Sequence, residues 1–216
     1  MEFNHAVILC NGDPPEEQFL RRHWKEADLR IAADGGANLL FRLELQPDFI
    51  VGDLDSIEEE VRRGFPGGSL VCIEEQDTND ADKAIRFALG KGVATVHLLG
   101  AAGRRLDQFI TNLEVMYKYA DQLRIILWTE LERMEFINCS WKDRLPPAST
   151  LSLLPVFGAV RKLTATGLAF PLQDKDLVPG IPPAGVSNKV VGSEVLIEIG
   201  EGKPLLVISS PDQQET

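Results

Sequence analysis

The sequence predicts an α/β protein in two parts, with a mostly parallel sheet flanked by helices over residues 1–128 and an all-β sandwich over residues 129–216. Two observations lead to this fold class. Up to Trp128, short apolar runs alternate with segments of helical spacing, whereas prolines and short β-rich runs dominate after it. The chain also has 216 residues, 44% of them hydrophobic, which is enough for one large or two small cores.

The first part contains apolar runs that we interpret as strands. They are residues 6–10 (AVILC), 29–33 (LRIAA), 48–52 (DFIVG), 70–73 (LVCI), 95–100 (TVHLLG) and 124–128 (RIILW). Segments of helical spacing separate them, at residues 16–27, 37–45, 56–65, 80–92 and 106–120. Several of these segments begin after Asp, Ser or Asn, which cap helix N-termini. Regular alternation of strand and helix is typical of a Rossmann-like parallel sheet with helices on both faces.

The second part contains short apolar runs with no long helical period. The clearest runs are residues 149–155, 159–167, 194–200 and 204–210. Prolines between them interrupt helices and favour turns. Short strands and turns of this kind predict the sandwich, and residues 211–216 (PDQQET) are expected to form a frayed tail.

The charge and the apolar runs narrow the classes of partner. The net charge is −11, from 22 basic and 33 acidic residues, and no concentrated basic run offsets it. Such a chain repels a phosphate backbone, so we expect no nucleic-acid partner, and any anionic substrate must be bound locally. The apolar runs are too short to cross a bilayer and the start MEFNHAV lacks a secretion signal, so we expect no membrane partner and a cytoplasmic location. Three widely spaced cysteines suggest neither disulfides nor a zinc site.

Polar or glycine-rich loops follow the first five predicted strands. Because the carboxyl ends of parallel strands share one edge of a sheet, we expect these loops to converge on one crevice. In PDFIVGDLDS (47–56), Asp53 and Asp55 are separated by a single leucine. Two carboxylates this close favour a bound cation, and their hard oxygens suit Mg²⁺ together with substrate phosphates. The alternative is that Asp55 caps the next helix while Asp53 is solvated.

Three further segments at the same edge carry residues suited to phosphate binding. The two glycines of DGGAN (34–38) let backbone N–H groups approach a nucleotide, although a tight turn would use the same residues. The loop GAAGRRLD (100–107) offers two arginines to phosphate oxygens, unless these are solvated surface residues. Lys83 lies three residues after Asp80 and would either meet a phosphate or pair with Asp80.

These segments together predict a reaction class. Carboxylates for magnesium, glycines for close approach and arginines for phosphate are the parts that phosphoryl transfer requires. The chain contains no Walker-type G-x-x-x-x-G-K-[ST] and no G-x-G-x-x-G, so hydride transfer on a nicotinamide lacks support. The residues therefore favour an enzyme that transfers a phosphoryl group from a nucleotide bound with Mg²⁺.

Five segments resemble the ordered motifs of the thiamine pyrophosphokinase family. They are ADGGAN (33–38), GDLDS (52–56), QDTNDADKA (76–84), GAAGRRLDQ (100–108) and SN (187–188). Their order and spacing cover most of the chain. Members of this family use ATP and Mg²⁺ to convert thiamine into thiamine diphosphate and AMP. They pair an α/β nucleotide-binding domain with a β-sandwich domain and act as homodimers, and the resemblance implies the same activity, cofactors and assembly here.

The resemblance also implies roles for single residues. The acidic metal positions of the family match Asp53, Asp55 and Asp80, which together with Arg105 would carry the catalysis. The nucleotide-binding positions match Asp34, Gly35, Gly36, Asn38, Lys83, Arg105 and Asp107. The thiamine-binding positions, of which the last two would reach the pocket across the dimer, match Gln76, Asp77, Ser187 and Asn188.

One departure from the family concerns the organic substrate. Some relatives carry an aromatic residue shortly after the Ser-Asn pair, which stacks on the thiamine ring, whereas Val190 and Val191 follow here. Either another aromatic residue covers that face, or the substrate is gripped differently. Two alternatives therefore stay open: a diphosphokinase for another hydroxymethyl compound such as a pterin, and a module that binds Mg-ATP without transferring a group. The proton acceptor also stays open between Asp77 and Asp80.

Overall fold

The structure is a computed structural model that describes residues 3–182 and 185–210. The tail expected at residues 211–216 lies outside the described residues. The chain divides into two compact units. Unit 1 comprises the residues up to Val115 and Gln122–Thr129, and unit 2 comprises Met116–Asp121 and the residues from Glu130 onward. The last turn of a helix that begins in unit 1 therefore belongs to unit 2.

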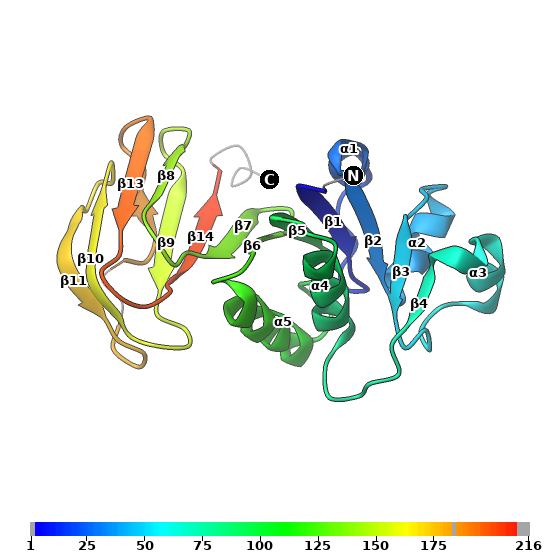
Figure 1. Cartoon of the computed structure of the whole chain (residues 1–216). Helices are drawn as coiled ribbons and strands as arrows, with labels where there is room; N and C mark the ends of the chain where they lie inside the picture. Colours follow the sequence, from blue (N-terminus) through cyan, green and yellow to red (C-terminus); the bar gives the residue numbers. More distant parts are fainter. Residues whose placement is uncertain (1–2, 183–184, 211–216) are drawn as a thin grey trace. The chain divides into compact units, whose positions relative to one another are not determined.

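The strands of unit 1 form a parallel sheet, in the order β6-β5-β1-β2-β3-β4 (Figure 1). They are β1 (His5–Leu9), β2 (Leu29–Ala33), β3 (Phe49–Gly52), β4 (Leu70–Cys72), β5 (Thr95–Leu99) and β6 (Arg124–Trp128). Each of the predicted runs in this part forms a strand. The sequence-based prediction of a parallel α/β sheet is therefore confirmed.

Helices follow the strands of unit 1 in alternation. They are α1 (Glu17–Glu26), α2 (Gly36–Arg42), α3 (Glu59–Gly64), the 3₁₀ helix η1 (Gly67–Ser69), α4 (Asp80–Gly90) and α5 (Leu106–Tyr119). Side chains cap two of the N-termini. The Glu16 carboxylate accepts hydrogen bonds from two N–H groups in the first turn of α1, and the Asn79 Oδ1 atom accepts one from Asp82 N at 3.0 Å in α4.

The alternating side chains of the buried strands pack against helices on both faces. Val7 and Leu9 of β1 belong to one core cluster with residues of α1, α2 and α3, including Leu20 and Leu40. Helix α4 packs against β1, β2 and β3 through small and aliphatic residues that lie outside this cluster. Because both faces of the sheet are covered, the strands read as nearly continuous apolar runs, which is why they could be recognised.

Unit 2 contains two antiparallel sheets, in the orders β12-β9-β14-β7 and β11-β10-β13-β8 (Figure 1). The strands are β7 (Glu132–Phe136), β8 (Trp141–Arg144), β9 (Thr150–Leu154), β10 (Val160–Thr166), β11 (Leu172–Leu177), β12 (Asn188–Lys189), β13 (Glu194–Glu198) and β14 (Leu205–Ser209). Leu151 and Leu206 of the first sheet share one core with Val160 and Val195 of the second. The predicted all-β sandwich is therefore confirmed.

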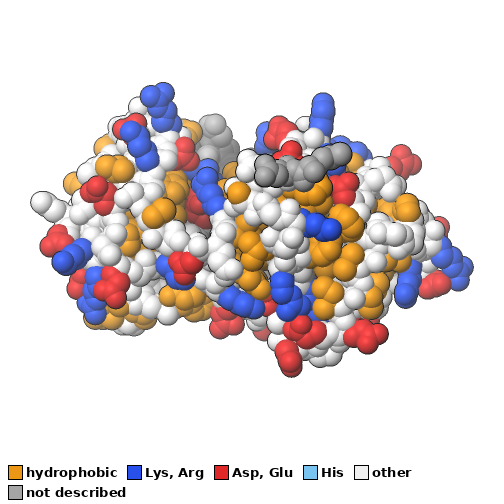
Figure 2. Space-filling view, in the orientation of Figure 1, with side chains coloured by type: hydrophobic (Ala, Val, Ile, Leu, Met, Phe, Trp, Pro, Cys, Tyr) orange, Lys and Arg blue, Asp and Glu red, His pale blue; other side chains and the backbone are white. Residues whose placement is uncertain are grey.

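The surface carries both signs of charge. Figure 2 shows Lys and Arg side chains interspersed with Asp and Glu side chains on the face that it presents. Among the described residues, every helix is too short or too polar to cross a bilayer.

Candidate active site

A cavity of about 780 Å³ opens in unit 1 at the carboxyl edge of the parallel sheet. Strands β2, β3 and β4 lie on one side of β1, and β5 and β6 lie on the other. The loops after β1 and β5 therefore leave the sheet in opposite directions, and the crevice between them is the usual ligand site of such sheets. Both loops line the cavity, together with the segment before α4, and the lining residues include Asn11, Gly12, Asp53, Asp55, Gln76, Asp77, Asp80, Lys83, Arg104 and Arg105.

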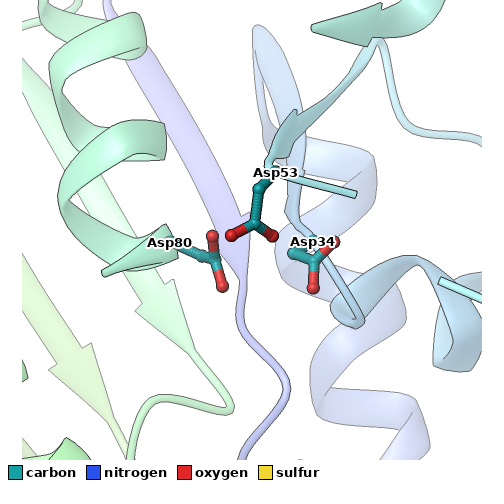
Figure 3. Close-up of side chains that lie close together, drawn as sticks. All are labelled: Asp34, Asp53 and Asp80. Carbon is teal, nitrogen blue, oxygen red and sulfur yellow. The ribbon is translucent and has the colours of Figure 1, made fainter. Parts of the chain in front are cut away.

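Three carboxylates meet at this edge and point toward one another (Figure 3). Asp34 follows β2, Asp53 follows β3, and Asp80 is the first residue of α4. One carboxylate oxygen from each lies within 4.8 Å of the other two. Gly52 makes the approach possible, since a Cβ atom at this position would lie 2.7 Å from the Asp34 Cβ and 3.1 Å from the Asp80 Oδ1. We call these three residues the carboxylate cluster.

The surroundings of the carboxylate cluster shift the pKa values of its three members in different directions. Burial raises the pKa of Asp34, which is 2% exposed, and hydrogen bonds from Gly35 and Ser56 only partly offset this. Burial also raises the pKa of Asp80, and the Asp34 charge adds to the effect. For Asp53, burial acts in the same direction, but a hydrogen bond from Gln76 Nε2 at 3.0 Å and the Lys83 charge outweigh it and lower the pKa. Asp53 is thus the carboxylate most readily ionised.

The carboxylate cluster has the features of a site for a hard cation. Asp34 Oδ1 and Asp53 Oδ1 are buried, and within residues 3–182 and 185–210 no group donates a hydrogen bond to either oxygen. Buried carboxylate oxygens without a donor are costly, and a cation that binds to them removes this cost. Oxygen donors from carboxylates, with space beside them for water and phosphate, suit Mg²⁺. The residues present therefore fit the magnesium ion that the sequence predicts.

The composition of the carboxylate cluster differs from the predicted metal set of Asp53, Asp55 and Asp80. Asp55 lines the same cavity, but it is exposed and lies outside the cluster, and its Oδ1 accepts a hydrogen bond from Ser56 Oγ at 2.9 Å. Between the two aspartates the backbone turns through a left-handed conformation at Leu54, with φ 65°. This turn separates the two carboxylates, and Asp34 takes the third place in the cluster.

Asparagine at position 34 is expected to stabilise the metal-free protein. Because the pKa of Asp34 is higher in the folded protein than the value of about 3.9 in the unfolded chain, the fold favours the protonated carboxyl. This stabilisation is fully present below a pH of about 3.9 and is lost as the pH rises through the pKa of the folded protein. Asp34→Asn removes this buried charge, and asparagine tolerates the φ of 40° found there. At pH 7 we expect the free energy of unfolding of the variant, measured by thermal unfolding, to be about 1 kcal/mol higher than that of the unchanged protein. This difference should disappear toward pH 3. The variant should also lose the stabilisation by Mg²⁺, and equal stabilisation of both proteins would contradict a ligand role for Asp34.

The other residues of the predicted nucleotide loop have structural contacts. Gly36 begins α2 directly against the backbone of β1. Asn38 uses both ends of its carboxamide, since Nδ2 donates to Ser56 O at 2.9 Å and Oδ1 accepts from Glu58 N at 3.0 Å. These hydrogen bonds tie α2 to the segment after β3. Asn38 therefore supports the loop that carries Asp53 and Asp55, and it is absent from the cavity lining.

The arginine-bearing loop lies at the open side of the cavity. Arg104 and Arg105 both line it, and both are exposed. The Arg105 guanidinium donates to the Asp107 carboxylate, from Nε at 3.2 Å and from Nη2 at 2.5 Å. This hydrogen-bonded pair raises the pKa of Arg105 and lowers the pKa of Asp107. Asp107 itself is absent from the lining, and its carboxylate contacts the guanidinium of Arg105.

The predicted thiamine-binding residues lie in both units. Gln76 and Asp77 line the cavity of unit 1. Ser187 and Asn188 belong to unit 2, where Ser187 has a left-handed φ of 53° and donates its N–H to Ser152 Oγ at 2.9 Å. Asn188 is buried, and its side chain forms hydrogen bonds with the backbone of Phe170, a residue that is 74% exposed.

Three asparagines that line the cavity, Asn11, Asn79 and Asn112, were not predicted as site residues, and the last two contact each other. Asn79 Nδ2 donates to Asn112 Oδ1 at 2.8 Å, and Asn112 Nδ2 donates to Ala101 O at 2.8 Å. Both residues line the cavity and join the segment before α4 to the loop after β5. The signal in the sequence that could have identified Asn112 is its position on the apolar side of the predicted helix at residues 106–120, where a polar side chain would be buried and would need a partner.

Two family models match the chain, one for each part. Residues 20–127 match "Thiamin pyrophosphokinase, catalytic domain", and residues 142–204 match "Thiamin pyrophosphokinase, vitamin B1 binding domain". The chain is 29% identical to thiamine pyrophosphokinase 1 of Arabidopsis thaliana, with 90% of this chain and 82% of the relative covered. It is 27% identical to thiamine pyrophosphokinase of Bacillus subtilis, with 95% and 98% covered.

Solved structures with these names have the same fold. The crystal structure of thiamine pyrophosphokinase from Bacillus subtilis superposes with a TM-score of 0.84 at 22% identity, covering 96% of this chain and 100% of the other. Thiamin pyrophosphokinase from Candida albicans gives 0.83 at 18% identity, covering 97% and 90%. At such identities the likeness concerns the fold alone. Since the catalytic-domain model matches half of the chain and a second model from the same family matches the sandwich, the chain belongs to the thiamin pyrophosphokinase family.

Proposed function

We propose that this chain transfers the diphosphate group of ATP to the hydroxyl of thiamine, giving thiamine diphosphate and AMP, with Mg²⁺ as the metal. The carboxylate cluster carries this proposal, because it lies in the same cavity as the arginine-bearing loop in a member of this family. The family assignment does not favour a pterin diphosphokinase or an ATP sensor.

Asp34, Asp53 and Asp80 are the residues that would hold Mg²⁺. When bound, this ion neutralises the charge of the ATP phosphates and positions them for displacement. Arg105, oriented by Asp107, contributes a fixed positive charge to the phosphates at the open side of the cavity. Beside Asp34, Gly36 packs against the backbone of β1, and Gly35 packs against the side chains of Asn11 and Ser56.

The transfer itself is a displacement at phosphorus. The hydroxyl oxygen of thiamine forms a bond to the β-phosphorus, and the bond from this phosphorus to the oxygen that bridges the α- and β-phosphates breaks, releasing AMP. We assign the proton of the hydroxyl to Asp77, which lines the cavity outside the carboxylate cluster, whereas Asp80 is needed for the metal. Gln76 donates to Asp53 and lies beside Asp77, so it links the thiamine site to the metal site.

The proposal is tested by product analysis. The protein is incubated with ATP, Mg²⁺ and either thiamine or hydroxymethylpterin, and the products are measured by mass spectrometry. We expect AMP and thiamine diphosphate to form in equal amounts when thiamine is the acceptor, and no AMP to form when hydroxymethylpterin is the acceptor. AMP formation only with the pterin would identify the other diphosphokinase. Binding of ATP without AMP formation from either acceptor would indicate a sensor and refute the proposal.

Unit 2 would complete the thiamine site. We propose that Ser187 and Asn188 serve this site in a homodimer, and the cytoplasmic location stays a prediction from the sequence. The carboxamide of Asn188 fixes the segment between β10 and β11, since Nδ2 donates to Phe170 O at 2.6 Å and Oδ1 accepts from Phe170 N at 3.0 Å. The backbone of Phe170 is therefore held in place while its side chain is exposed, and Phe170 is our candidate for the aromatic residue that Val190 and Val191 do not supply.

Phe170→Ala is expected to raise the KM for thiamine by about tenfold, because stacking of an aromatic ring on a ligand contributes about 1 kcal/mol or more. The KM for ATP should stay within a factor of two. Steady-state kinetics with each substrate varied in turn gives both values. Exposed Ile181 in the same unit provides the control, and Ile181→Ala should leave both constants unchanged. An unchanged KM for thiamine in Phe170→Ala would exclude the stacking role.

A further inference from the structure

Lys83 has an unusual environment for a lysine. It lies in α4, one turn after Asp80, and its side chain is only 2% exposed. Its Nζ atom lies 3.3 Å from Asp80 Oδ1 and 3.5 Å from Asp53 Oδ2. Burying an ammonium group is costly unless opposite charges surround it, and both carboxylates that it contacts belong to the carboxylate cluster.

The carboxylate cluster and the Lys83 ammonium together have a defined formal charge. With its three carboxylates ionised and the Lys83 ammonium beside them, the cluster carries a formal charge of −2. One divalent cation neutralises this charge. The ammonium therefore reduces the repulsion within the metal-free cluster, and it also repels a cation that enters the cluster.

We propose that Lys83 is a built-in counter-ion that holds the carboxylate cluster together in the metal-free protein and weakens its affinity for Mg²⁺, so that the metal enters and leaves with the substrate. This inference rests on the proposed metal site. Lys83 acts as a positioning residue, because its ammonium is directed at carboxylate oxygens. A lysine that served as a phosphate ligand would instead affect ATP binding and leave the affinity for Mg²⁺ alone unchanged.

The test measures Mg²⁺ binding without any nucleotide, by titration calorimetry at pH 8, together with thermal unfolding of the metal-free protein. Methionine has nearly the shape of the lysine stem but no charge. Lys83→Met is expected to lower the unfolding midpoint of the metal-free protein. It should also bind Mg²⁺ about tenfold more tightly than the unchanged protein, as Coulomb's law gives for the loss of a nearby unit charge.

A matched control removes a positive charge from the same helix. Arg86 lies one turn further along α4 and donates to Glu75 at 2.9 Å, outside the carboxylate cluster. Arg86→Met should leave the affinity for Mg²⁺ within a factor of two. Equal or weaker Mg²⁺ binding by Lys83→Met, compared with the unchanged protein, overturns the role of Lys83 and leaves the metal site intact. Absence of Mg²⁺ binding by the unchanged protein overturns the metal site as well.

A double variant keeps the test decisive if Lys83→Met does not fold without metal. Adding Asp80→Asn restores the formal charge of −2 in the carboxylate cluster. The double variant is expected to unfold at a higher temperature than Lys83→Met in metal-free buffer, because it has one negative charge fewer in the carboxylate cluster. A double variant that is no more stable than Lys83→Met would show that the lysine contributes through packing alone, and the counter-ion role would be wrong.

Discussion

Asp53→Asn is expected to lower the turnover number by about 10²–10³-fold while the fold stays intact. Asp53 is the most readily ionised member of the carboxylate cluster, and it also contacts Gln76 and Lys83. Asparagine keeps the size of the side chain and can still accept a hydrogen bond, but it removes the charge that a cation requires. The rate of AMP formation with saturating ATP and thiamine gives the turnover number, and circular dichroism checks the fold.

Asp55→Asn provides the comparison for this prediction. Asp55 lies two residues further along, lines the same cavity and is exposed, but it is not part of the carboxylate cluster. Its replacement should reduce turnover much less than that of Asp53. Equal losses in both variants would mean that both residues hold the metal when substrate is bound, as the sequence alone predicts.

Gly36→Ala is expected to destabilise unit 1 by about 3 kcal/mol or to prevent it from folding. A Cβ atom at this position would lie 2.2 Å from Leu9 O and 3.0 Å from Leu9 C. Both atoms belong to the backbone of β1, at the centre of the sheet, so they cannot move aside as the end of a flexible side chain could. Urea unfolding followed by tryptophan fluorescence measures the change in the free energy of unfolding.

Gly90→Ala is the matched control, because this glycine also lies at the end of a helix, and apart from its chain neighbours and its own helix backbone no atom of the described residues lies within 4 Å of a Cβ built on it. Alanine should stabilise α4 here by about 0.5 kcal/mol, owing to its higher helix propensity. A Gly36→Ala variant as stable as Gly90→Ala would show that α2 can move away from β1 without cost.

The strands of unit 1 could be predicted because burial on both faces makes them continuously apolar. In unit 2, β9, β10, β13 and β14 were recognised in the same way. The strands β7 (ERMEF), β8 (WKDR) and β11 (LQDKDL) were not recognised, since each has few apolar residues and charged residues stand beside them. Antiparallel pairing forms these strands: β7 and β8 pair with β14 and β13, which lie far along the sequence, and β11 pairs with the preceding strand β10.

The candidate site could be predicted in part for a similar reason. The residues that follow strands were correctly expected to gather at one edge, because that expectation needs only a parallel sheet. The place of Asp34 in the carboxylate cluster depends on register: Ala33 of β2 lies beside Val51 of β3, so the residues that follow them also lie side by side. A spacing of two residues suggested Asp53 with Asp55 instead, and register between strands is not visible in a single sequence.

The position of β1 between β2 and β5 also has a consequence for the order in which the protein is made. The residues that line the cavity lie between Cys10 and Asn112, so the ribosome has synthesised all of them before any strand of unit 2. However, β1 cannot gain its second neighbour until residue 99 has emerged, which delays closure of the sheet. The carboxylate cluster of unit 1 can then assemble during translation, before Ser187 and Asn188 have been synthesised. A nascent chain would thus complete the cavity of unit 1, with the proposed metal site, before the residues that unit 2 would contribute to the proposed thiamine site exist.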